Sequence, residues 1–118
     1  MSGMTLSPAA WFFALCAVVL VIGWGMLSPV ERLPLWSRTH DKLMHGAAFA
    51  LLAVLASLSL PHADALTLWV ALVVAGIAGE VAQHLSPHRQ FCWRDAAANA
   101  VGAAVGLGGY QWIIDPAL

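Results

Sequence analysis

The sequence predicts an all-α membrane protein, a four-helix transmembrane bundle with short loops that forms one domain over residues 1–118. Only 9% of the residues are charged and 61% are apolar, whereas an average soluble domain carries about 25% charged residues. The apolar residues fall into four runs, each of about the 20 residues that a helix needs to cross a bilayer. A soluble domain, a disordered chain and a basic nucleic-acid binder are therefore excluded.

The first two helices are expected over residues 8–27 and 42–60. The first run contains no charge, and Ser28-Pro29 and Pro34 follow it, which ends the helix. Residues 1–28 hold no Lys or Arg, so this run is expected to be a retained span rather than a signal peptide. The second run ends where Pro61 begins a tight turn.

The last two helices are expected over residues 65–85 and 95–114. Glu80 lies inside the third run, and Ser86-Pro87 ends it. The fourth run closes at Asp115-Pro116. The runs are continuous rather than alternating, and too few for a membrane β-barrel. Four spans place both termini on one side of the membrane.

Polar residues gather where the second helix starts, the third ends and the fourth starts, which is one face of the membrane. Asp41 and His45 are one helical turn apart, and so are Asp95 and Asn99. Glu80 lies one turn inside the same face. An isolated ionisable group in a bilayer costs several kcal/mol, so these residues predict a shared polar pocket that opens to one face.

Three motifs resemble the signature of the VanZ-like family of small bacterial membrane proteins, also called the teicoplanin-resistance protein family. They are Asp41-Lys42-x-x-His45, then Glu80-x-x-Gln83-x-x-x-Pro87-x-Arg89, then Asp95-x-x-x-Asn99-x-x-Gly102-x-x-x-Gly106, and together they cover residues 41–106. One departure is Gly79, where relatives often have an acidic residue. The resemblance implies a multi-pass protein of the cell envelope with a link to resistance against glycopeptide antibiotics.

The candidate catalytic residues are the ionisable ones of the pocket. Glu80 is expected to be the general acid or base, because burial raises the proton affinity of a carboxylate. Asp41 and His45 would relay the proton, and Asp95 would orient groups. For each residue a structural role remains open: Glu80 as a hydrogen-bonded carboxylate, Asp41 as a helix-terminal acid and Asp95 as the N-cap of the fourth helix.

The candidate ligand-binding residues are two cations and two amides. Arg89 and Lys42 suit an anionic group, and Asn99 and Gln83 would orient it. The alternative is that the cations lie at the interface with their charged ends in water. Gly102-x-x-x-Gly106 indicates close helix packing.

No metal or other cofactor is expected, although five residues of the pocket side would suit a divalent ion. These are Asp41, His45, Glu80, His84 and Asp95.

The sequence therefore predicts a protein that acts by acid/base chemistry on an anionic, lipid-linked or glycopeptide-related envelope molecule. The alternative is a non-catalytic protein that binds lipid or drug, or a subunit of a membrane complex. Its expected partners are membrane lipids, with no nucleic acid, and the sequence does not predict an oligomeric state. The expected location is the bacterial cytoplasmic (inner) membrane.

The side that the pocket faces is open. All five Lys and Arg lie on the pocket side, which places the pocket in the cytoplasm by the positive-inside rule. The usual pattern of the family and an envelope role favour the exterior.

Overall fold

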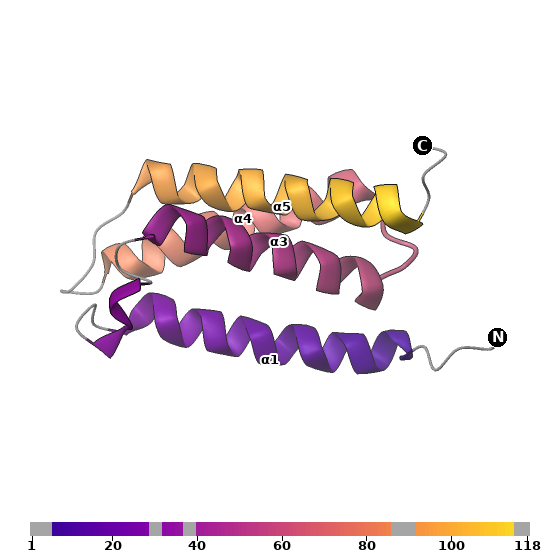
Figure 1. The fold of residues 1–118 in the computed structure, drawn as a ribbon, viewed down its shortest axis with the longest axis horizontal. Helices are drawn as coiled ribbons and strands as arrows, with labels where there is room; N and C mark the ends of the chain where they lie inside the picture. Colours follow the sequence, from indigo (N-terminus) through magenta and orange to yellow (C-terminus); the bar gives the residue numbers. More distant parts are fainter. Residues whose placement is uncertain (1–5, 29–31, 37–39, 86–91, 115–118) are drawn as a thin grey trace.

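A computed structural model describes residues 6–28, 32–36, 40–85 and 92–114. Four long helices run side by side, and the start of α1 and the end of α5 lie at the same end of the bundle (Figure 1). They are α1 (Pro8–Leu27), α3 (Asp41–Ser59), α4 (Ala65–His84) and α5 (Trp93–Ile114). No strand occurs in the part of the chain that the structure describes, which confirms the predicted all-helical fold.

Three of the helices, α1, α3 and α4, are long and apolar enough to cross a membrane. The helix α5 is the longest at 22 residues, yet it lies outside this group. The reason lies in its composition, because Arg94, Asp95, Asn99 and several glycines stand where the other helices carry large apolar residues.

The helix starts follow from local capping. The backbone N–H of Ala10 donates to Ser7 Oγ (3.2 Å), and Pro8 occupies the first turn of α1, a position that suits its missing N–H. Asp64 caps α4, since its carboxylate accepts from the backbone N–H (3.2 Å) and the hydroxyl (2.6 Å) of Thr67. The expected start of α1 at residue 8 and of α4 at residue 65 are confirmed.

The start of α5 differs from the expectation. The helix begins at Trp93 rather than at residue 95, and the backbone N–H of Asp95 already donates to the Cys92 carbonyl (3.1 Å). The interpretation of Asp95 as the N-cap is therefore wrong, because this residue lies within the first turn. Its side chain turns toward α3 instead of toward the end of its own helix.

The closest packing in the bundle is between α3 and α5. A Cβ atom added at Gly102 would lie 2.1 Å from the carbonyl oxygen of Gly46, and one at Gly106 would lie 2.4 Å from that of Ala50. The two backbones approach so closely only because these positions lack a side chain. The predicted role of Gly102 and Gly106 in helix packing is confirmed.

The helix α4 completes the buried core against α3 and α5. Phe49, Leu52 and Ala103 form one buried cluster, and a second cluster includes Leu68 of α4 and Leu107 of α5. The indole of Trp69 donates from Nε1 to the carbonyl oxygen of Ala100 (2.9 Å). Packing and this hydrogen bond together fix α4 beside the α3–α5 pair.

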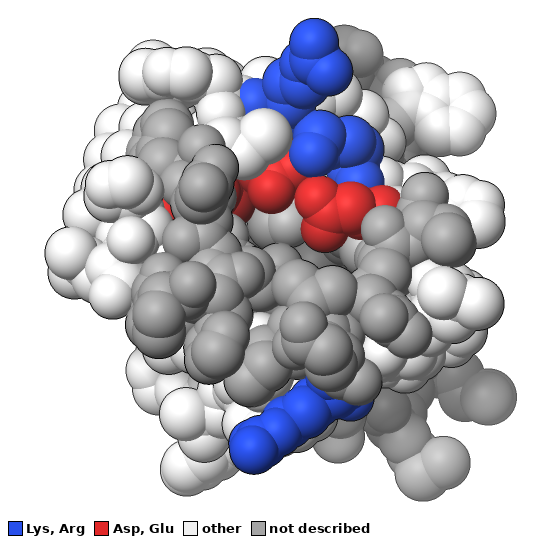
Figure 2. Space-filling model, turned by 90° about the vertical axis from the view of Figure 1, so that its left-hand side faces the viewer, with Lys and Arg blue, Asp and Glu red and all other residues white. Residues whose placement is uncertain are grey.

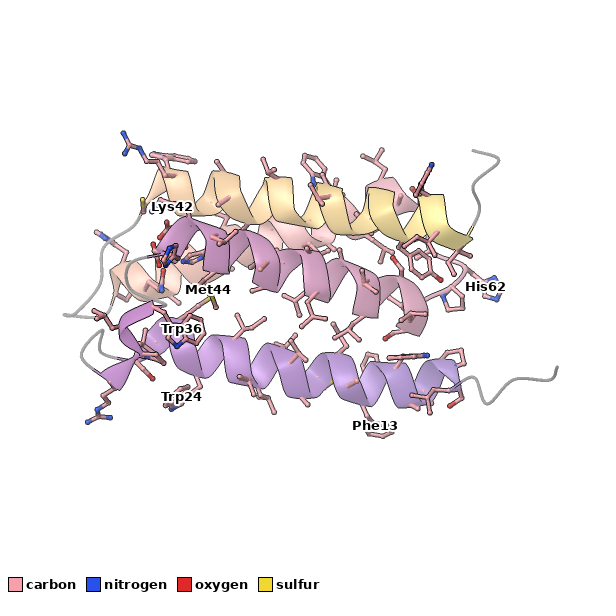
Figure 3. The ribbon with its side chains drawn as sticks, in the orientation of Figure 1. Phe13, Trp24, Trp36, Lys42, Met44 and His62 are labelled. Carbon is pink, nitrogen blue, oxygen red and sulfur yellow. The ribbon has the colours of Figure 1, made fainter. Side chains whose placement is uncertain are left out.

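The helix α1 is attached more loosely, and none of its residues is buried. It lies along α3 and touches α4 less. Phe13 and Trp24 point away from the other helices (Figure 3), and Leu20 is 74% exposed. An outer face of this composition suits contact with lipid rather than water.

Candidate functional site

Charged side chains gather at the end of the bundle where α3 starts, α4 ends and α5 starts. In Figure 2, which shows this end, acidic side chains lie in one patch beside basic ones. The structure brings together six of the residues that the sequence singles out: Asp41, Lys42, His45, Glu80, Asp95 and Asn99.

His45 lies at the centre of this polar cluster and is 9% exposed. Its Nδ1 is 3.0 Å from Asn99 Oδ1. An amide oxygen only accepts hydrogen bonds, so Nδ1 carries the proton. The other ring nitrogen, Nε2, is 3.5 Å from Asp41 Oδ1 and 3.5 Å from Asp95 Oδ2. The imidazole thus joins α3 to α5 and faces two carboxylates with one edge.

Lys42 holds these two carboxylates from the outside. Its ammonium group lies 3.3 Å from Asp41 Oδ2 and also binds Asp95 Oδ1. Each carboxylate therefore uses one oxygen for Lys42 and turns its other oxygen to His45. The lysine side chain is 47% exposed, whereas that of Asp95 is 11% exposed.

Glu80 is fully buried, with Oε1 3.9 Å from His45 Nδ1. Among the described residues neither of its oxygens has a hydrogen-bond partner, and the buried Nδ2 of Asn99 also has none. A buried carboxylate of this kind requires a positive charge or a proton nearby, and the imidazole of His45 lies within 4 Å of it.

Gly76 makes the room for this arrangement. A Cβ atom there would lie 3.2 Å from Asn99 Nδ2 and 3.3 Å from the ring of Phe49. Because Gly76 of α4 has no side chain, there is room for the Asn99 side chain of α5 to form its hydrogen bond with His45 of α3.

Gln83 and His84 are not among the six residues of the cluster. The side chain of Gln83 donates from Nε2 to the carbonyl oxygen of Met26 (2.8 Å), which links α4 to the end of α1. His84 is exposed, and it is absent from the group of residues that would suit a metal ion. Arg89, the second predicted anion-binding residue, lies outside the described residues.

A cavity of about 540 Å³ leads to the cluster from between α1 and α3. Asp41, His45 and Gln83 supply its polar wall, while Glu80 and Asp95 are absent from the lining. Met44 and Trp36 lie between α1 and α3 at this end of the bundle (Figure 3). The other lining residues are mostly apolar: Val21, Ile22, Trp24, Gly25, Met26, Leu33, Pro34, Ala48 and Phe49.

The cavity continues along the two helices. A second space of about 450 Å³ shares four of its lining residues and is otherwise lined by small or apolar side chains of α1 and α3. The shared residues are Val21, Ile22, Met44 and Ala48, and the further ones are Ala17, Val18, Ala47 and Leu51. One polar end and a long apolar channel together match the shape of an amphiphile.

The contribution of α1 to the site is what sequence reasoning missed. The residues of α1 that line the cavity belong to a run that is apolar all round, so no pattern in the sequence distinguishes them from those that face lipid. One contact of α1 falls at a position that the sequence marks as unusual. Gly79, which stands where the resemblance leads one to expect an acidic residue, lies close to Met26 of α1. A Cβ atom at Gly79 would lie 2.8 Å from the end of the Met26 side chain.

The chemistry open to this arrangement follows from its groups. Carboxylates, an imidazole and an ammonium group support proton transfer, and the carboxylates with the imidazole suit a cation. Comparison of the chain with protein-family models, with curated proteins and with solved structures found no match.

Proposed function

We propose that the chain is an integral protein of the bacterial inner membrane in which all four helices are spans. The helix α5 runs beside α3, and its residues away from the bundle are apolar: Val101, Val105, Trp112 and Ile113 are all more than half exposed. Asp95 and Asn99 face inward and are buried, whereas its exposed polar residues, Arg94 and Gln111, lie near the two ends of the helix. Lipid would therefore meet an apolar surface on α5, as it would on α1.

We further propose that the chain is VanZ-like, on the strength of the three motifs that run from Asp41 to Gly106. All three motifs supply neighbouring groups, since the His45 side chain is hydrogen-bonded to Asn99 and lies next to Glu80. A link to glycopeptide resistance and a role in the cell envelope belong to the same proposal.

The function that the geometry supports best is binding and acid/base modification of an amphiphilic envelope molecule. The observation that carries this proposal is that two adjoining open pockets, which share four lining residues, form an apolar channel between α1 and α3 that ends at Asp41 and His45. A lipid chain would occupy the channel, and its polar head group would lie against these two residues.

In this proposal the groups that touch the head group are His45 and Asp41. Glu80 acts through His45, because it is buried 3.9 Å behind the imidazole and is not part of the cavity wall. Asp95 and Asn99 position the same ring from α5. Lys42 and Arg89 would supply positive charge for an anionic head group at the rim.

Filling the cavity tests the binding step. In purified full-length protein in detergent, Ala48→Trp should weaken binding of a single-chain lipid phosphate by at least about tenfold, or 1.4 kcal/mol, as measured by native mass spectrometry. Ala48 lines both parts of the cavity. The matched control is Ala97→Trp on the exposed side of α5, which should bind like the parent. Equal binding by the two variants would overturn the proposal.

His45→Asn tests whether chemistry follows binding. Bacteria that express the parent chain should grow at a teicoplanin concentration that stops control cells, and His45→Asn should remove this advantage. His62→Asn is the matched control, since His62 lies at the opposite end of the bundle (Figure 3). If His45→Asn keeps the full advantage, the site binds its ligand without acid/base chemistry.

A further inference from the structure

We infer that Asp41, His45 and Asp95 form a binding site for one divalent transition-metal ion, with zinc as its probe. The inference rests on the proposed function only for what the ion does to a ligand; binding of the ion stands on coordination geometry alone. The three residues each place one ligand atom within 4.8 Å of those of the other two.

The spacing of the ligand atoms suits a small ion. Nε2 of His45 is 3.5 Å from one oxygen of Asp41 and 3.5 Å from one oxygen of Asp95. Two ligands that each lie about 2.1 Å from a tetrahedral ion are about 3.4 Å apart. Both spacings from His45 match this value, and the two carboxylate oxygens lie within 4.8 Å of each other, so an ion bound by all three residues would draw these oxygens together.

The tautomer of His45 favours an ion at Nε2. Because Nδ1 donates to Asn99 Oδ1 at 3.0 Å, a neutral imidazole has its lone pair on Nε2, and that lone pair faces two carboxylate oxygens. Three electron-rich atoms therefore converge at this point. A histidine that ligates a metal commonly donates its other N–H to an oxygen in this way, so Asn99 is the expected outer partner.

Lys42 leaves the site open instead of filling it. Its ammonium group binds Asp41 Oδ2 and Asp95 Oδ1, whereas the oxygens that face His45 are Asp41 Oδ1 and Asp95 Oδ2. The lysine therefore orients both carboxylates from outside, which is the part that outer-shell partners play in metal sites.

The charge of the cluster leads to the same conclusion through a separate residue. Glu80 is fully buried beside His45 and neither of its oxygens has a partner among the described residues. Among the described residues of the cluster, Glu80 with Asp41 and Asp95 makes three carboxylates against the one ammonium group of Lys42. Two negative charges are left over, which one divalent cation would neutralise, and a metal-bound imidazole would turn a more strongly polarised N–H edge toward Glu80.

Three protein ligands leave one position of a tetrahedral ion open, as in catalytic zinc sites. Asp41 and His45 border the cavity, so the open position would face the head group of a bound amphiphile. An ion there would explain how a site rich in carboxylates accepts an anionic head group, and a water on the ion would supply the acid/base group.

Zinc titration of the detergent-solubilised full chain, after removal of metal with a chelator, tests the inference. Isothermal titration calorimetry should give one site, and Asp95→Asn and His45→Gln should each weaken it by at least about 100-fold. The matched controls are Asp64→Asn and His62→Asn at the other end of the bundle, which should bind like the parent. Equal affinity in all five proteins, or no binding by the parent, would overturn the inference.

X-ray absorption at the zinc edge identifies the ligand atoms of zinc in the parent chain, so it tests the inference even if a variant fails to fold. The parent chain should show nitrogen and oxygen ligands at about 2.0–2.2 Å with an imidazole signature; a sulfur ligand, which would come from a cysteine, would contradict the assignment. Binding of the lipid phosphate by the chelated protein separates the two proposals. If the protein binds lipid and no zinc, only the metal-site inference is wrong. If it binds zinc and no lipid, the proposed function is wrong and the metal site stands.

Discussion

The two helices that flank α3 meet it in opposite ways. On one side, α5 packs so closely that Gly102 lies against the backbone of Gly46. On the other side, α1 has no buried residue and leaves a cavity of about 540 Å³ between itself and α3. We call the α3–α5 contact the close side and the α1–α3 contact the loose side. The polar cluster lies on the close side, and the space for a ligand lies on the loose side.

This difference shows how the bundle separates two requirements. Proton transfer and metal binding need side chains that are held to within a fraction of an ångström, and His45 is held by contacts to Asn99 and Asp95 across the α3–α5 seam. A chain of variable length needs walls that can adjust, and α1 supplies them. The following predictions change one side at a time, from the largest expected effect to the smallest.

Gly102→Ala should cause the largest loss of stability. The added Cβ atom would meet the Gly46 carbonyl at 2.1 Å, so the two helices must separate, at a cost of about 3 kcal/mol for overpacking. The measurement is thermal unfolding in detergent, followed by circular dichroism. Separation of the helices should also pull Asn99 from His45, so binding at the cluster should fall.

Gly108→Ala is the control for this change. A Cβ atom there meets nothing within 4 Å, and alanine favours a helix more than glycine does. Its stability should therefore equal or slightly exceed that of the parent. If the two variants unfold at the same temperature, the seam is not closely packed.

Leu15→Ala should have a smaller effect, because it changes the loose side. Leu15 of α1 packs against both buried clusters without being buried itself. In a bilayer the lost contacts are partly replaced by lipid, so the expected cost is about 1 kcal/mol of packing. Thermal unfolding measures it, and Leu20→Ala, which truncates a side chain that is 74% exposed, should cost less. A larger loss than that of Gly102→Ala would mean that α1 is docked as firmly as α5.

The close side is also the side that the sequence predicts well. Its signals are local and periodic: Asp41 and His45 share one face of a helix, Asp95 and Asn99 share another, and Gly102-x-x-x-Gly106 marks a packing stripe. The helix bounds follow from proline and capping residues, so the expected range of α1 matches the structure at both ends. The exception is Asp95, whose pairing with Lys42 and His45 requires contacts between residues more than 45 positions apart.

The loose side gives no such signals. A cavity depends on how far apart two apolar surfaces stand, and every residue of α1 is apolar whether it faces α3 or lipid. The unpartnered oxygens of Glu80 are hidden from sequence reasoning for a related reason, since its burial at 0% exposure depends on how closely the neighbouring helices pack. Physical chemistry thus predicts which residues gather and leaves open how tightly they are enclosed.

Asp64 should give the smallest effect, at the end of the bundle away from the cluster. Hydrogen bonds from the hydroxyl and the backbone N–H of Thr67 lower the pKa of its carboxyl group below the ordinary value of 3.8. A carboxyl group whose pKa is lower in the folded state stabilises the protein above the ordinary value, and this contribution is lost as the pH falls through the lowered pKa. Stability should therefore decline below about pH 4 in part through this residue.

Asp64→Asn removes this charge and keeps a side chain that can cap α4. The variant should unfold close to the parent temperature at pH 7 and should lose less stability than the parent between pH 5 and pH 3, when both are followed by circular dichroism in detergent. Because Asp64 is exposed and its side chain is hydrogen-bonded to Thr67 of α4, the α3–α5 seam should be unaffected, and zinc and lipid binding should stay at parent levels. A loss at pH 7 comparable to that of Gly102→Ala would show that the start of α4, and not the glycine seam, is what holds the close side together.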